Sequence, residues 1–444
     1  MLTGTGRVRP DRDLDRRIAA LAVPALGAIA AEPAYSLADT AIVGHLGRSQ
    51  LGSLAIASTA LNATAWLAIF LTMATTSAVA GLAAGQAAGR AARTVGSAYL
   101  VAVAGGIVIA LVMLAVATPV AVLLGGHGPV LSGAVGYLRV SAAGLPFLFV
   151  SYAGNGHLLG LADVRTPLRI AVTANLANVL LELALVYGLH LGLLGSAWGT
   201  VMAQVMAAVL YAAASWRRAR IRPARPGRTE VTALLRDGRR LSVRTIALGV
   251  VPLTTTAIAA RLGPVPLGAQ QIAMRVWYLL ALLLDSLAVP AQVFVSSHLG
   301  AGDRPGAYRV GQRTLRLGLL AGIAVGAVTA ALAFVVPYLF TPDEAIRHAA
   351  TIALLVAAAT MPATALAFVL DGLVLGLADY VAMRRAMIVA VFAYLPLAAL
   401  VLAFHGLGLP GIWAALGLWL AARAALLGRR WHAEFASDSV LTGI

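Results

Sequence analysis

The sequence predicts an all-α polytopic membrane protein with twelve transmembrane helices in two pseudo-symmetric six-helix lobes. Three observations predict it: long apolar runs, an alternating distribution of arginine, and an internal repeat. Hydrophobic residues make up 60% of the 444 residues and charged residues only 11%, and the mean hydropathy is +0.88. Apolar runs of about 18 or more residues can cross a bilayer. Since lipid offers backbone groups no hydrogen-bond partner, each run should be helical.

The apolar runs, taken in order, give twelve predicted spans. They lie at residues 17–44, 51–85, 95–122, 130–159, 166–189, 191–216, 241–262, 266–298, 310–338, 348–376, 384–404 and 408–428. The chain has no cysteine, so disulfides and thiolate metal sites are excluded. The first residues, MLTGTGRVRPDRDLDRR, lack the pattern of a cleavable signal and predict a short cytoplasmic tail.

Basic residues give the predicted orientation. All 33 are arginines; they precede the first span, follow every second span, and follow the last. The alternate loops are nearly free of arginine, with Arg48, Arg261 and Arg347 as exceptions. Positive charge prefers the cytoplasm, so both termini are predicted to be cytoplasmic in a plasma (inner) membrane. The net charge of +16 then reflects topology and does not indicate nucleic-acid binding.

An internal repeat divides the chain into two similar halves. TAIVGHLGRSQLGSLAIAS begins at Thr40 and TAIAARLGPVPLGAQQIAM begins 216 residues later at Thr256, with nine of nineteen positions identical. At the same offset, GLAD recurs at 160–163 and 376–379, and LGLLG at 191–195 matches LGLPG at 407–411. Each half has an even number of spans, so the halves are parallel repeats, an arrangement suited to alternating access.

The repeat sets the predicted domains. These are an N-terminal tail at 1–16, an N-lobe at 17–216, a cytoplasmic linker at 217–240, a C-lobe at 241–430 and a C-terminal tail at 431–444. The linker holds nine arginines.

Applying the offset to the polar residues within spans shows that the halves differ. The aligned pairs are Asp39 with Thr255, Asn178 with Tyr394, Glu182 with Ala398 and Thr200 with Leu416. Only the N-lobe keeps the polar member of each pair that could bind an ion. Asn175, Asn178 and Glu182 are spaced i, i+3, i+7 and share one helix face, and Glu32 and Asp39 likewise share a face.

Carboxylates within a membrane are costly and usually mark ion or proton paths. Asp39 and Glu182 are therefore the leading candidates for coupling, with Glu32 and Asn175 as secondary ones. The alternative is that these polar groups only satisfy one another within a helix bundle.

Three segments closely resemble the multidrug and toxic compound extrusion (MATE) family, and in particular its DinF branch. They are LADTAIVGHLG (37–47), ANVLLELALVYGLHLG (177–192) and VLDGLVLGLADYVAMRRAM (369–387). The resemblance runs over about 15–430. It implies twelve helices in two lobes and cation-coupled export of lipophilic, often cationic compounds.

The resemblance also implies a cation site in the N-lobe. The family's site positions fall on Asp39, Asn178, Glu182 and Thr200, with Glu182 standing where the family usually has aspartate. Carboxylate, amide and hydroxyl oxygens suit Na⁺, whereas a proton needs only a carboxylate buried enough to bind it. The coupling ion is thus H⁺ or Na⁺, with these four residues as metal ligands only if it is Na⁺; no other cofactor is expected.

Prolines in the first span indicate a kink. Pro24 and Pro33 predict either a static bend or, as proposed for the family, a bend that changes when Asp39 is protonated.

In the second half, Asp285 and Asp371 also lie within spans. Asp371 resembles an aspartate that some family branches use in a C-lobe cation site, but the acid that those branches carry in the seventh span is absent between Leu241 and Leu262. Asp371 is instead expected to contribute charge to the central cavity or to pair with Arg384 or Arg385.

These observations predict a secondary active efflux antiporter, not an enzyme. No GxxxxGK[ST] loop is present, so transport must draw on an ion gradient of H⁺ or Na⁺. The expected partners are amphipathic or cationic small molecules and membrane lipid, for a protein acting as a monomer. The alternative is a lipid or polysaccharide-precursor flippase, which needs a basic cavity; Arg139 and Arg244 are the candidates for it.

Overall fold

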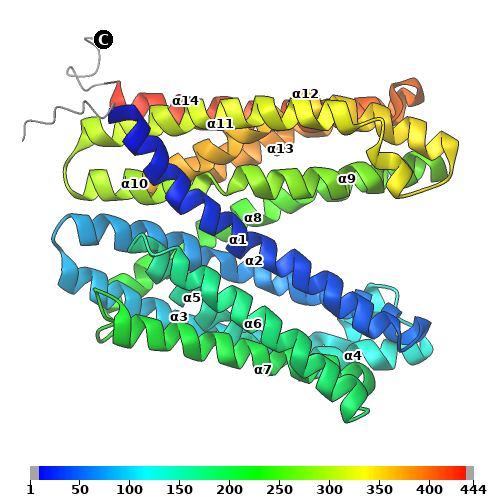
Figure 1. Cartoon of the computed structure of the whole chain (residues 1–444), viewed down its shortest axis with the longest axis horizontal. Coiled ribbons are helices and arrows are strands. Elements are labelled where there is room, and N and C mark those ends of the chain that lie inside the picture. The colour runs from blue at the N-terminus through cyan, green and yellow to red at the C-terminus, as the bar shows by residue number, and fades with distance from the viewer. Residues whose placement is uncertain (1–9, 437–444) are drawn as a thin grey trace, which may run out of the picture. The chain divides into compact units, whose positions relative to one another are not determined.

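A computed structural model of the chain describes residues 10–436, without the side chains of residues 10–13, 28–37, 48, 218, 264 and 405. Within that range the chain is helical throughout, with no strand (Figure 1). The first half contains α1 (Pro10–Gly44), α2 (Arg48–Ala84), α3 (Ala88–Leu123), α4 (Gly128–Ala142), α5 (Leu145–Gly160), α6 (Arg165–Leu183), the π-helix η1 (Ala184–Gly188), α7 (Gly192–Ala213) and the π-helix η2 (Ala214–Arg218).

The second half follows the same plan. It contains α8 (Arg228–Leu262), α9 (Pro264–Asp285), α10 (Ala288–Gly300), α11 (Arg304–Leu332), the 3₁₀-helix η3 (Val336–Leu339), α12 (Glu344–Gly376), α13 (Tyr380–Ala403), the 3₁₀-helix η4 (His405–Leu407) and α14 (Gly408–Phe435).

The helices match the predicted spans in order. Ten helical segments of the described chain are long and apolar enough to cross a membrane, and the pair α4 and α5, bent by 51°, adds an eleventh. Helix α1, which has 35 residues, covers the first predicted span. The all-α polytopic fold is therefore confirmed. The orientation of the termini stays a prediction.

The chain forms two compact units. The N-terminal unit is Gly27–Ser242, and the C-terminal unit runs from Val243 onward and includes α1 up to Leu26. An ion pair attaches the start of α1 to the C-terminal unit, because Arg313 donates to both carboxylate oxygens of Asp15 at 2.6 and 2.5 Å. This hydrogen-bonded pair holds the pKa of Asp15 below its usual range. The segment expected to be a linker, 217–240, is helical from Arg228 onward.

The backbone repeats itself at the offset seen in the sequence. Left-handed residues recur 216 positions apart at four helix boundaries: Gly47 and Gly263 (φ 126° and 120°), Gln86 and Gly302 (58° and 77°), Ala162 and Ala378 (60° and 56°), and Gly192 and Gly408 (56° and 48°). Non-glycine residues adopt this conformation only at a cost of about 1–2 kcal/mol. The two halves therefore share the backbone turn at these four helix boundaries.

Close helix packing repeats too. A Cβ added at Gly156 of α5 would lie 2.6 Å from the carbonyl oxygen of Thr72 in α2, and one added at Gly372 of α12 would lie 2.4 Å from that of Ala288 in α10. In membranes, small residues let helix backbones approach closely. Each unit thus has the same contact between its second and fourth spans.

Candidate functional site

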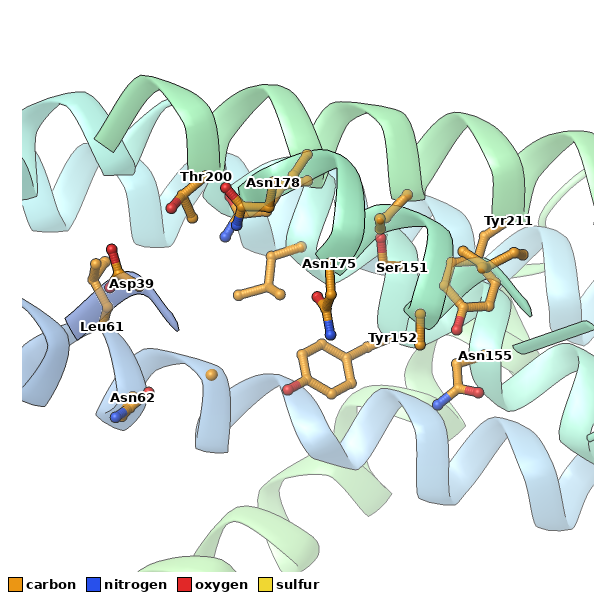
Figure 2. A pocket seen from close by; sticks show the side chains of 18 of the residues that line it. Asp39, Leu61, Asn62, Ser151, Tyr152, Asn155, Asn175, Asn178, Thr200 and Tyr211 are labelled. Carbon is orange, nitrogen blue, oxygen red and sulfur yellow. The ribbon is translucent and has the colours of Figure 1, made fainter. Parts of the chain in front are cut away.

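A polar pocket lies within the N-terminal unit, bounded by helices α1, α2, α4, α5, α6 and α7 (Figure 2). Its volume is about 340 Å³. The polar side chains that line it are Asp39, Ser58, Asn62, Tyr137, Ser151, Tyr152, Asn155, Asn175, Asn178, Thr200, Gln204 and Tyr211. None of the lining residues is an arginine, and Asp39 is the single charged one. The pocket therefore favours a cation or a neutral hydrogen-bonding compound.

Asp39 lies at one end of this pocket, with Thr200 near it and Tyr211 at the other end (Figure 2). Its side chain is buried, and the Ser196 hydroxyl donates to Oδ1 at 2.8 Å. The Tyr137 hydroxyl is 3.4 Å from Ser196 Oγ and also interacts with Thr200. Side chains from α1, α4 and α7 thus meet around one carboxyl group.

Glu182 lies behind the pocket, in the last turn of α6 immediately before the π-helix η1. It is fully buried, no hydrogen bond of good geometry reaches Oε1 or Oε2 in the described structure, and the polar side chains that act on it are those of Asp39 and Ser196. The carboxyl groups of Glu182 and Asp39 interact directly. Single π-helical turns within longer helices are rare and are frequent at functional sites, so the position of η1 fits a site at this end of α6.

The Asp39–Glu182 pair has no arginine among the partners recorded for it. Asn178 is one turn before Glu182, is buried, and has an Oδ1 atom without a donor. Two carboxyl groups in contact resist ionising together, and buried acceptors without donors are costly. The arrangement thus has acceptor oxygens that can take up a proton or a cation. Residues 10–436 offer no cluster of three or more His, Cys, Asp or Glu side chains that could hold a metal.

The structure brings the four predicted coupling residues together. Asp39, Asn178 and Thr200 line the pocket, and Glu182 contacts Asp39. Asn175 lines the pocket farther along α6 (Figure 2). The remaining N-lobe predictions concern α1: Pro24 is half-buried within the helix, whereas the side chains of Glu32 and Pro33 lie outside the described residues.

Sequence reasoning missed two members of this site, Ser196 and Tyr137. Ser196 precedes Thr200 by four residues, so the helical period already places both hydroxyls on one face of α7. Tyr137 carries no comparable signal, since its place beside Ser196 depends on how α4 packs against α7.

In the C-terminal unit, Asp371 of α12 is buried between two arginines. Arg244 of α8 donates to Oδ2, and Arg423 of α14 donates to Oδ2 and, at 3.3 Å, to Oδ1. The predicted pairing with Arg384 or Arg385 is therefore wrong: the carboxylate meets arginines from two other helices. The signal for Arg423 was its position inside a predicted span, where an ionisable residue is expensive.

Asp285 belongs to the same charged group. It ends α9, is half-buried, and interacts with Asp371, Arg244 and Arg423. We name these four residues the C-terminal charge cluster. With all four ionised its charges cancel.

The C-terminal counterparts of the N-terminal site make no such site. The Thr255 hydroxyl donates to the Pro252 carbonyl within its own helix at 2.7 Å. Tyr394 accepts a hydrogen bond from Thr254 at 3.2 Å, and Ala398 and Leu416 are buried in the apolar core.

An all-helical chain built from two copies of a six-span unit, with a polar pocket inside one copy, is typical of a membrane transporter. The MatE family model matches residues 24–183 and 241–405. The chain therefore belongs to this family of multidrug and toxin extrusion transporters, and it is a transporter, not an enzyme.

Relatives agree with this assignment. The chain is 32% identical to Protein DETOXIFICATION 43 of Arabidopsis thaliana over 67% of its length, although the match spans only 56% of that protein. It is 27% identical to DNA damage-inducible protein F of Escherichia coli (strain K12), covering 96% of this chain and 94% of that one. A MOP superfamily transporter from Pyrococcus furiosus has the same fold, with a TM-score of 0.88, 20% identity and 96% coverage of both chains. The predicted resemblance to the DinF branch is confirmed.

Proposed function

We propose that this protein is a secondary active antiporter that exports amphipathic or cationic compounds in exchange for H⁺ or Na⁺. The observation that carries the proposal is that Asp39 and Glu182, both buried, are electrostatic neighbours beside the polar pocket. A site of this kind binds positive charge and is in reach of whatever occupies the pocket.

The coupling ion binds between Asp39 and Glu182. A proton suffices, because two adjacent carboxyl groups hold one proton readily. Na⁺ would take oxygen ligands from both carboxylates, from Asn178 Oδ1 and from the Thr200 hydroxyl. The lack of a donor to Asn178 Oδ1 and to both Glu182 oxygens supports a bound cation in either form.

Export follows when ion and substrate prefer different states. Binding of the ion shifts the equilibrium between inward- and outward-facing conformations only by its difference in affinity for the two. Asp39 is both an ion ligand and a wall of the pocket, so the ion and a cationic substrate compete for the same negative charge. This competition supports exchange in place of co-transport.

The test is efflux of a fluorescent cationic dye from proteoliposomes under a proton gradient and then under a Na⁺ gradient. One gradient should drive efflux in the wild type, Asp39→Asn should abolish it, and the exposed-acid control Glu344→Gln should leave it intact. Equal efflux from Asp39→Asn and wild type would show that the site is not the coupling site.

The alternative, a flippase for lipid or polysaccharide precursors, needs a basic cavity. Arg244 is neutralised by Asp371, Arg139 is exposed, and no arginine lines the pocket. Absence of dye efflux under both gradients, together with movement of a labelled lipid between leaflets, would favour this alternative.

A further inference from the structure

A buried chain of hydrogen bonds runs from the pocket-bearing helices to the segment between η2 and α8. The hydroxyls of Tyr99 (α3) and Ser215 (η2) are 2.7 Å apart, and Ser215 Oγ is 2.9 Å from His157 Nδ1 (α5). His157 Nε2 is 2.9 Å from the carbonyl oxygen of Ile221. The Tyr99 hydroxyl also lies 3.4 Å from the Tyr211 carbonyl oxygen. Four segments of the N-terminal unit are thereby joined.

This chain is shielded from water and from other charges. His157 and Ser215 are 0% exposed and Tyr99 is 7% exposed. The titratable neighbours are the phenols of Tyr99 and Tyr211, and no carboxylate or guanidinium of the described residues acts on the ring. The residues of α2 that lie against Gly156 and Gly160 of α5 carry no charge: Thr72, Thr75, Thr76 and Val79.

The hydrogen bonds fix a donor direction. A carbonyl only accepts, so Nε2–H of His157 donates to Ile221. In the neutral ring Nδ1 then accepts from Ser215, and Ser215 accepts from Tyr99. The opposite order is also available: with Nδ1 protonated, Ser215 donates to Tyr99, and Tyr99 donates to the Tyr211 carbonyl at 3.4 Å. A chain with two such orders can pass a proton from end to end.

One end of the chain lies next to the pocket wall, where the Tyr99 hydroxyl reaches the carbonyl oxygen of Tyr211. Tyr211 and Asn155 line the pocket at the end away from Asp39 (Figure 2). The Tyr99 hydroxyl lies against Gly154, where an added Cβ would be 2.8 Å from it. Glycine at this position lets the hydroxyl reach α5 one residue from the pocket wall. Between the two ends the pocket is polar and large enough to hold water.

The other end is covered by residues 219–227, which we name the capping segment. Its backbone is fixed to α3: the Ala224 N–H donates to the Ala92 carbonyl at 2.9 Å, and the Gly227 N–H donates to Ser97 Oγ at 3.1 Å. A Cβ at Gly96 would lie 1.8 Å from the Ala224 carbonyl oxygen. Only glycine at position 96 allows the capping segment to lie in this place.

We propose that Tyr99, Ser215 and His157 form a proton relay between the pocket and the capping segment, and that the capping segment gates it. The relay rests on the proposed function in its proton-coupled form. It provides the coupling proton with a route toward the end of the unit that carries the arginine-rich segment.

The proton balance is simple. Tyr99 takes a proton from pocket water and passes its own to Ser215, and Ser215 passes its own to His157 Nδ1. The ring then carries two protons and releases the one on Nε2 to water when Ile221 moves away. Reorientation of the ring and the hydroxyls restores the first order. A route open at both ends would dissipate the gradient, so closure by the Ile221 carbonyl is what makes a relay compatible with coupling.

The decisive test measures proton flux without substrate, using proteoliposomes that enclose a pH-sensitive dye. Gly96→Ala should displace the capping segment and raise the proton leak several-fold. Gly89→Ala, on the same helix but facing open space, should not. Adding His157→Gln to Gly96→Ala should return the leak to the wild-type level, because glutamine keeps a donor for Ile221 but cannot carry a proton through.

A leak that persists in the double variant would overturn the relay, and no leak in Gly96→Ala would overturn the gate. If Gly96→Ala does not fold, Ser97→Ala, which removes only the two hydrogen bonds between Ser97 Oγ and the backbone of Gly227, replaces it. Neither readout requires substrate export, so the proposed function is tested separately.

Transport then separates a relay from a merely structural role. His157→Gln and Ser215→Ala should lose proton-driven dye efflux and keep dye exchange at equal pH, while the exposed-residue control His432→Gln should keep both. Loss of exchange as well would mean that His157 only supports the fold. If the wild type is driven by Na⁺ alone, the relay is wrong and the antiport proposal stands.

Discussion

The two units carry their buried acids at different positions of the repeat and place them in opposite surroundings. In the N-terminal unit, Asp39 and Glu182 interact electrostatically, and Asp39 lines a pocket that contains no basic side chain. In the C-terminal unit, Asp371 is closed between Arg244 and Arg423. The position that matches Asp371 in the N-terminal unit is Asn155, a pocket residue.

The difference shows how duplication can separate tasks. The backbone turns and glycine contacts are shared by both halves, so the scaffold does not determine where ions bind. What differs is whether a buried carboxylate has its counter-charge within the protein. In the proposed mechanism, the carboxylate with a built-in counter-charge serves the fold, and the carboxylates without one bind the coupling ion. The following predictions test this contrast, from the largest expected effect to the smallest.

Asp371→Asn should cause the largest loss of stability. It leaves two buried guanidinium groups without the carboxylate that they share, and breaking a buried ion pair from one side costs about 3–5 kcal/mol. The measurement is the free energy of unfolding in detergent by chemical denaturation. Adding Arg423→Met should recover part of the loss. A single variant as stable as wild type would mean that the C-terminal charge cluster does not hold the unit together.

Glu182→Gln should have the opposite pattern: it should impair transport and leave the stability of the fold intact. Glutamine has nearly the shape of glutamate and removes the repulsion between two neighbouring carboxylates, so the unfolding free energy should not fall below that of wild type. Ion-driven efflux should fall about 5- to 150-fold, the range expected when the coupling free energy between ion and substrate is lost. Dye efflux and unfolding are measured on the same preparations, with Glu344→Gln as the control. A destabilised variant with normal efflux would reverse the assignment of roles.

Gly156→Ala and Gly372→Ala should lower the free energy of unfolding by similar amounts. Each adds a methyl group against a carbonyl of the neighbouring helix, at 2.6 and 2.4 Å, and overpacking of this kind costs about 1–3 kcal/mol. The measurement is the unfolding free energy of both variants, with Gly89→Ala as the control. A large effect in one half alone would show that the units share a sequence pattern without sharing the packing behind it.

Much of the scaffold could be predicted from the sequence, because its causes are local or periodic. Apolar length determines a span, and a fixed offset reveals a repeat. The breaks were missed: the span at 130–159 bends by 51° between α4 and α5, and the span at 266–298 is interrupted between α9 and α10. Prolines occur just after each break, at Pro146 and Pro290, but proline also lies inside unbroken α12 as Pro362.

The sequence predicted only those site residues whose burial in a membrane is costly. Asp39 and Glu182 stood out because charge is expensive in lipid, whatever surrounds it. The partner of Asp371 did not follow from that rule, since Arg244, Arg384, Arg385 and Arg423 all lie near predicted spans and only packing selects two of them. The Tyr99–Ser215–His157 chain was equally hidden, because its members are 58 and 116 residues apart in sequence.

The smallest expected effect on stability comes from the aspartates of the two GLAD turns, Asp163 and Asp379. Asp379 caps α13 through the Ala382 N–H at 2.9 Å and also accepts from Arg430 at 2.6 Å, whereas Asp163 accepts only from the Thr166 N–H, at 3.0 Å. Burial opposes ionisation of Asp379, but the Ala382 N–H and the Arg430 guanidinium outweigh it and hold the pKa below its usual range.

Asp379→Ala should therefore cost about 1 kcal/mol at pH 7, as lost caps do, and Asp163→Ala less. A carboxyl group whose pKa is lowered by folding stabilises the fold above its unfolded pKa, about 3.9 for aspartate, and this stabilisation disappears as the pH falls through the folded value. The deficit of Asp379→Ala relative to wild type should accordingly shrink below about pH 4. Unfolding free energies measured from pH 7 to pH 3 check this, and a deficit that does not change with pH would assign the contribution to packing and not to the charge of Asp379.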